Sequence, residues 1–118
     1  MKKRSAYINT WKELSADKSM VFLAGPRQSG KTTLARIIAQ SYTNSLYFNW
    51  DIQSHRTQLI ENPLFFESVE RRDSSRPLIV FDEIHKYGDW KNYLKGVYDQ
   101  FHAGYQFLVS GSGRLDIY

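Results

Sequence analysis

The sequence contains no cysteine. This absence excludes a disulfide scaffold and any zinc or iron–sulfur site that is held by cysteine. The chain also lacks an apolar run close to the roughly 20 residues that a membrane-spanning helix needs, and no signal-peptide pattern follows its basic start at residues 1–4. We therefore expect a cytoplasmic protein with no membrane partner.

The composition is that of a folded chain rather than a disordered one, because 42% of the 118 residues are hydrophobic and 15% are aromatic. This length fits one domain with its own core. We therefore treat residues 1–118 as a single domain.

A glycine-rich motif occupies residues 25–32, which read Gly-Pro-Arg-Gln-Ser-Gly-Lys-Thr and fit the phosphate-binding pattern G-x-x-x-x-G-K-[ST]. Glycines let such a loop curl so that successive N–H groups point at one anion, and the N-terminus of the following helix adds partial positive charge. Lys31 then supplies a full charge for the β- and γ-phosphates, and Thr32 a hydroxyl for Mg²⁺. The motif predicts a nucleoside triphosphate and its metal ion as ligands.

Strands and helices alternate along the chain. Residues 20–24, just before the motif, are an apolar run typical of a buried strand, and apolar residues recur at helical spacing just after it. Further strands are predicted at residues 46–50, 78–81 and 105–109. Helices are predicted at residues 7–14 and 89–104, with another that starts at Asn62-Pro63 and turns Phe65, Phe66 and Val69 inward. This alternation predicts a parallel sheet with helices on both faces.

Two acids follow the apolar strand at residues 78–81. At the carboxyl end of a buried strand, Asp82 can hold Mg²⁺ directly or through water, opposite the hydroxyl of Thr32. Glu83 is one residue further along, where a carboxylate can orient and deprotonate an attacking water. Adjacent acids at a strand end can also be a solvent-exposed loop pair, and the phosphate-binding motif favours the functional interpretation.

The net charge is +4 and is concentrated in residues 1–60, which carry +6, whereas residues 61–118 carry −2. A polyphosphate ligand accounts for part of this basic excess. Nucleic-acid binding remains possible but unsupported, because no stripe of Lys and Arg interleaved with aromatic residues is present.

The segments Gly-Pro-Arg-Gln-Ser-Gly-Lys-Thr-Thr-Leu and Phe-Asp-Glu-Ile-His-Lys resemble the Walker A and Walker B motifs of AAA-type P-loop ATPases. They are most similar to those of prokaryotic AAA ATPases whose ATPase core precedes an uncharacterised C-terminal domain. The resemblance implies ATP and Mg²⁺ as cofactors, ATP and ADP as partners, and catalytic roles for Lys31 and Glu83. It implies that the nucleotide is contacted by Gly25, Pro26, Arg27, Gln28, Ser29, Gly30, Lys31, Thr32 and Thr33.

The same resemblance implies an α/β three-layer P-loop fold, whose four strands lie in the order 2-3-4-1. In that family a polar residue at the tip of the fourth strand, called sensor 1, contacts the γ-phosphate or the attacking water. Ser110 and Ser112 match this position, and we favour Ser112.

The sequence departs from the family by ending at Tyr118, before the fifth strand, the helical lid and the later sensor and finger arginines. We therefore expect an incomplete core that binds ATP better than it hydrolyses it. The first strand then becomes a sheet edge, which predicts self-association or a covering helix at residues 7–14.

Two alternatives remain open at this stage. Asp-Glu-Ile-His at residues 82–85 also occurs in some helicases, although a second motor domain is lacking and the interval between the Walker motifs is short. The other alternative is a non-catalytic module in which nucleotide orders the domain to present a binding surface. The sequence does not show whether ATP or GTP is preferred, and ATP is expected by default, because GTPases usually carry an Asn-Lys-x-Asp stretch and this sequence has none.

Overall fold

The computed structural model describes residues 2–24 and 31–111. The α-helices are α1 (Lys2–Ser15), α2 (Lys31–Gln40), α3 (Gln53–Glu61) and α4 (Trp90–Phe101). The strands are β1 (Met20–Ala24), β2 (Ser45–Asn49), β3 (Leu78–Asp82) and β4 (Gln106–Gly111). Two short 3₁₀ helices, η1 (Phe65–Ser68) and η2 (Ile84–Lys86), complete the described elements.

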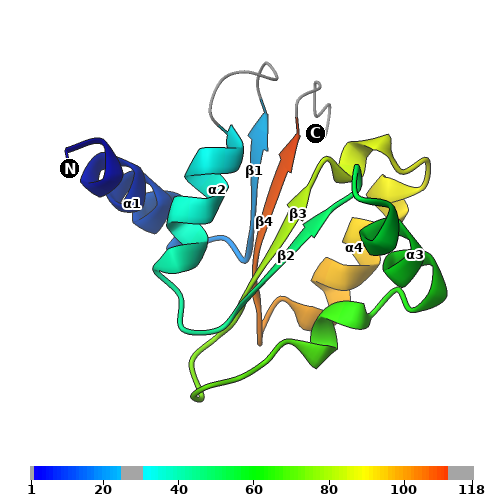
Figure 1. The fold of residues 1–118 in the computed structure, drawn as a ribbon. Coiled ribbons are helices and arrows are strands. Elements are labelled where there is room, and N and C mark those ends of the chain that lie inside the picture. The colour runs from blue at the N-terminus through cyan, green and yellow to red at the C-terminus, as the bar shows by residue number, and fades with distance from the viewer. Residues whose placement is uncertain (1, 25–30, 112–118) are drawn as a thin grey trace.

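The four strands form one parallel sheet in the order β1-β4-β3-β2. Helices α1 and α2 cover one face of the sheet, and α3 and α4 cover the other (Figure 1). Every residue of β3 and β4 is buried, because both strands are central and both faces are covered. The predicted three-layer α/β fold and its strand order are confirmed.

Side chains alternate across β3 and divide the core in two. Leu78 and Val80 pack in the cluster under α2, whereas Ile79 and Phe81 pack in the cluster under α3 and α4. The second cluster is rich in aromatic rings, and Phe81 makes edge-on contacts with the rings of several neighbours. Such pairs add about 0.5–1.5 kcal/mol to simple area burial. Residues next to Asp82 are therefore held in a tightly packed sheet.

The prediction of a helix that starts at Asn62-Pro63 is wrong. Asn62 instead ends α3, where its N–H donates to the Gln58 carbonyl, and only the short η1 follows. No sequence pattern predicted α3, because Leu59 is its buried residue and the rest of the helix has no apolar stripe. Phe65, Phe66 and Val69 are buried as predicted.

Helix α1 packs beside α2. Its buried Trp11 donates from Nε1 to the Tyr42 hydroxyl at 3.0 Å. On the opposite side of β1, a cavity of about 490 Å³ lies against α4, with Met20 and Tyr98 among its lining residues. Strand β1 is one of the two edge strands of the described sheet, and self-association through it stays a prediction. No helix among the described residues is long and apolar enough to cross a membrane.

Candidate functional site

The carboxyl ends of three strands meet at one edge of the sheet. Strand β4 lies between β1 and β3, so the ends of β1, β4 and β3 stand next to one another (Figure 1). Helix α2 begins at Lys31, after residues 25–30, which follow β1. In parallel α/β sheets, ligands bind outside the carboxyl ends of the strands. The candidate site is built at this edge.

Asp82, the last residue of β3, is 2% exposed. The register sets it beside Ser110 of β4 and Asn49 of β2. The Ser110 hydroxyl donates to Asp82 Oδ1 at 3.0 Å, and the Tyr47 hydroxyl donates to Oδ2 at 2.6 Å. Each carboxylate oxygen therefore accepts a hydrogen bond from a hydroxyl on a neighbouring strand.

Tyr47 is a site residue that the sequence analysis missed. Burial raises the pKa of its hydroxyl far above the ordinary value, and the hydrogen bond to the Asp82 carboxylate and that carboxylate's charge raise the pKa further. Asn49 Nδ2 donates to the Tyr47 oxygen at 3.1 Å. The available signal was the spacing of Tyr47 and Asn49, which puts two polar tips on one face of a strand that otherwise reads as apolar.

Glu83 follows Asp82 with a left-handed backbone, at φ 60° and ψ 22°. Its N–H donates to the Ser110 carbonyl at 2.7 Å. The conformation costs about 1–3 kcal/mol for a residue with a side chain, and such residues concentrate at functional sites. The Glu83 side chain is 12% exposed, and its Oε2 lies 3.1 Å from Nζ of Lys86.

Lys86 joins Glu83 to a second acid, because its Nζ also lies 2.8 Å from Asp51 Oδ1. The hydrogen bond to Asp51 is the main cause that raises the pKa of Lys86, and Glu83 adds to it. Lys86 therefore stays protonated at neutral pH and brings a positive charge to the carboxylate of Glu83.

His85 packs against the end of β4. Its Nδ1 is buried and has no hydrogen-bond partner among the residues that the structure describes. A Cβ atom at Gly111 would lie 2.7 Å from Cε1 of His85, so the ring occupies the space that any larger residue would need. Its Nε2 is 3.9 Å from Glu83 Oε2. Glycine at 111 thus permits a close contact between η2 and β4.

The structure brings only some of the predicted site residues together. Asp82, Glu83 and Ser110 lie together at the sheet edge. Lys31, Thr32 and Thr33 form the first turn of α2, and the Thr33 side chain is exposed. The remaining predicted residues lie outside the described part of the chain: Gly25, Pro26, Arg27, Gln28, Ser29, Gly30 and Ser112.

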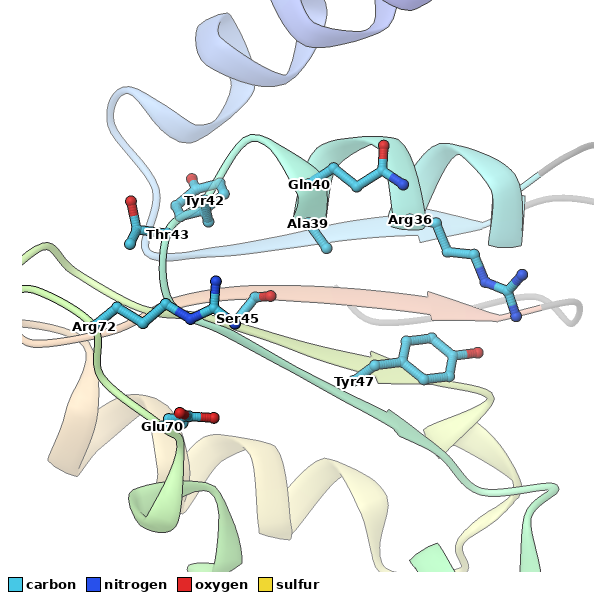
Figure 2. A pocket seen from close by; sticks show the side chains of 9 residues that line it. All are labelled: Arg36, Ala39, Gln40, Tyr42, Thr43, Ser45, Tyr47, Glu70 and Arg72. Atoms are coloured by element: carbon cyan, nitrogen blue, oxygen red, sulfur yellow. The ribbon is translucent and has the colours of Figure 1, made fainter.

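A second cavity of about 490 Å³ lies between α2 and β2. Figure 2 shows its lining side chains, with Arg36 and Tyr47 toward one end and Arg72 and Glu70 toward the other. Tyr47 therefore lines this cavity with its ring while its hydroxyl bonds to the buried Asp82.

A family model described as "AAA domain" matches residues 17–118 of the sequence. No curated protein matches the chain. The family match covers all four strands and both acids of the candidate site, and it indicates a nucleotide-binding, ATPase-like function.

Proposed function

We propose that this chain, which belongs to the AAA domain family, binds ATP with Mg²⁺ and hydrolyses it slowly. The observation that carries the proposal is the buried carboxylate of Asp82, held on both oxygens by hydroxyl donors. Asp82 lies at the carboxyl end of the strands, the end of the sheet at which α2 begins with Lys31. A buried carboxylate with a fixed orientation, next to a phosphate-binding sequence, is suited to hold the metal ion that accompanies a nucleotide.

The donor set suits Mg²⁺ bound together with phosphate. The described residues include no group of three or more His, Asp and Glu that could hold a metal by themselves. Mg²⁺ usually keeps several waters and takes one or two protein oxygens together with substrate phosphates. In the proposal Asp82 and the hydroxyl of Thr32 hold the ion, which neutralises phosphate charge.

The phosphates are assigned to Lys31 and to the backbone of residues 25–33. Glu83 orients and deprotonates the attacking water. Lys86 competes with that water for Oε2 of Glu83, at 3.1 Å, which is our reason to expect slow turnover. Ser112 is proposed to contact the γ-phosphate, while Ser110 supports Asp82.

Binding is tested by thermal unfolding with and without ATP and MgCl₂. A ligand at about 100 times its Kd stabilises the fold by about 2.7 kcal/mol, so the melting temperature should rise clearly. Lys31→Ala should abolish the rise. Lys12→Ala, which removes an exposed lysine of α1, should keep it. Absence of any rise with the wild-type chain would refute the proposal.

Hydrolysis is tested by phosphate release from Glu83→Gln, which keeps the size of the side chain and removes the base. A general base contributes about 10²–10⁴-fold, so slow turnover should disappear while the binding shift remains. Glu67→Gln, at an exposed position, is the matched control. Unchanged turnover in Glu83→Gln would leave a non-catalytic nucleotide-responsive module. Turnover stimulated by nucleic acid would favour the helicase alternative instead.

A further inference from the structure

The carboxylate of Asp82 is held between two neighbouring strands. Ser110 reaches it from β4 at 3.0 Å and Tyr47 reaches it from β2 at 2.6 Å. The shorter distance lies in the range of a charge-assisted O–H···O⁻ bond, which is about twice as strong as a neutral one. Tyr47 therefore makes the stronger of the two hydroxyl contacts.

The direction of the Tyr47 hydrogen bond is fixed by its other neighbour. Asn49 donates from Nδ2 to the Tyr47 oxygen at 3.1 Å, and the Asn49 side-chain oxygen accepts the N–H of Asp51 at 2.9 Å. A tyrosine hydroxyl has one proton. Because its oxygen accepts from Asn49, that proton is directed to Asp82.

The two hydroxyl contacts set the orientation of the Asp82 carboxylate, because one hydroxyl donates to each of its oxygens. The carboxylate therefore faces a direction set by the strands rather than by a freely rotating side chain. Asp82 is thus oriented before any ligand binds.

We propose that Tyr47, oriented by Asn49, is a positioning residue that sets the carboxylate of Asp82 for Mg²⁺. This inference rests on the proposed function, in which Asp82 holds the ion. Partners that orient a metal ligand typically contribute about 10–100-fold to metal affinity. Tyr47 also lines the cavity between α2 and β2 (Figure 2).

The test is Tyr47→Phe, which keeps the ring and removes the hydroxyl. ATP binding is measured at increasing MgCl₂ and also in EDTA. The Mg²⁺ concentration for half-maximal binding should rise about 10-fold or more, while ATP affinity in EDTA stays at the wild-type value. Asn49→Ala should shift the Mg²⁺ dependence in the same direction by a smaller factor, because it only loosens Tyr47.

The matched control is Tyr42→Phe. Tyr42 lines the same cavity, but its hydroxyl bonds to Trp11 of α1, so the Mg²⁺ dependence should not change. The melting temperature of each variant without ligand reports any general loss of structure.

Three results would overturn the inference. A Tyr47→Phe variant with the wild-type Mg²⁺ dependence would show that the hydroxyl does not position Asp82. An equal loss of ATP binding in EDTA would assign Tyr47 a general structural role. If Tyr47→Phe were to melt too low for binding measurements, a wild-type Mg²⁺ dependence in Asn49→Ala would show instead that Tyr47, oriented by Asn49, does not position Asp82. Failure of the wild-type chain to bind ATP with Mg²⁺ is a separate outcome, because it refutes the proposed function itself.

Discussion

The two ends of the sheet both bury polar side chains, but of different kinds. At the amino end, where β2, β3 and β4 begin, the buried groups include the neutral amides of Asn44 and Gln106, which are 0% and 3% exposed. At the carboxyl end, they include the acids Asp82 and Glu83 together with the hydroxyl of Ser110. Burial is expensive for a charge and cheap for a fully bonded amide. The two ends therefore serve different purposes.

Both the NH₂ group and the oxygen of the Asn44 side chain are hydrogen-bonded. Its Nδ2 donates to the Ser75 carbonyl at 2.9 Å and to the Asp73 carboxylate at 3.0 Å, and its Oδ1 accepts the Arg72 N–H at 2.7 Å. These bonds attach the loop of residues 71–76 to the start of the sheet. The amino end is thus arranged for stability.

Two features of the carboxyl end are unfavourable for the stability of the fold. Asp82 is an acid at 2% exposure, and Glu83 has a left-handed backbone. Such costs are tolerated where a site needs a fixed charge, and ligands of parallel sheets bind at this end. Substitutions at the amino end should therefore change the stability of the fold, whereas substitutions at the carboxyl end should change ligand binding.

The largest effect is expected for Asn44→Ala at the amino end. It removes several partly buried hydrogen bonds and leaves the Arg72 N–H without its acceptor. The free energy of unfolding should fall by about 2–4 kcal/mol, as measured by urea denaturation. At low temperature, ATP affinity of the folded fraction should be unchanged. A loss of affinity in that fraction would remove the distinction between the two ends.

Asp82→Asn should have the opposite profile. The amide keeps the shape of the carboxylate: its oxygen can accept from Tyr47, and the hydroxyl of Ser110 can rotate to accept from its NH₂ group, so the unfolding free energy should change little. Affinity for ATP with Mg²⁺ should fall about 100-fold, or about 2.7 kcal/mol, in a calorimetric titration. A large loss of stability with normal binding would contradict the assignment of this end to ligand binding.

Gly111→Ala tests the packing of the carboxyl end. The added Cβ would meet the ring of His85, and overpacking of this kind costs about 1–3 kcal/mol. Gly96→Ala is the matched control, because nothing lies within 4 Å of that position in α4, and it should stabilise the fold by about 0.5–1 kcal/mol. Thermal unfolding measures both. Stabilisation by Gly111→Ala would mean that the His85 contact is loose.

Lys86→Met should have the smallest effect. Exposed ion pairs contribute about 0.2–1 kcal/mol to the free energy of unfolding. The hydrogen bonds to Asp51 and Glu83 raise the pKa of Lys86. Its contribution to stability is complete below its ordinary pKa of 10.5 and is lost as the pH rises through the higher pKa of the folded state. Denaturation of both chains should therefore give a constant difference from pH 7 to 9 that shrinks above pH 10.5. A difference that grows with pH would exclude this ion pair as the cause.

The sequence predicted the fold where local patterns are strong. Residues 20–24 and 78–81 read as apolar strands, and the strands found there are β1 and β3. The strand order came from the family resemblance and is confirmed. Helix α3 was missed because a helix that buries little more than Leu59 leaves no periodic pattern.

The candidate site was predicted in part. Asp82 and Glu83 were found because they end an apolar strand, which is a local signal. Tyr47 was not found, because its contact with Asp82 spans 35 positions in the chain. Ser110 was considered for its place at the end of a strand, but its bond to Asp82 was not foreseen.

By itself, the sequence determined which reactive side chains are available, because a pattern typical of phosphate binding and a pair of acids after an apolar strand can be read from consecutive residues. Only the tertiary structure decided how the acid is held. The register of β2, β3 and β4 sets Tyr47 and Ser110 on opposite sides of Asp82. A one-residue shift of either neighbouring strand would turn its hydroxyl to the other face of the sheet, and no local pattern in the sequence fixes that register.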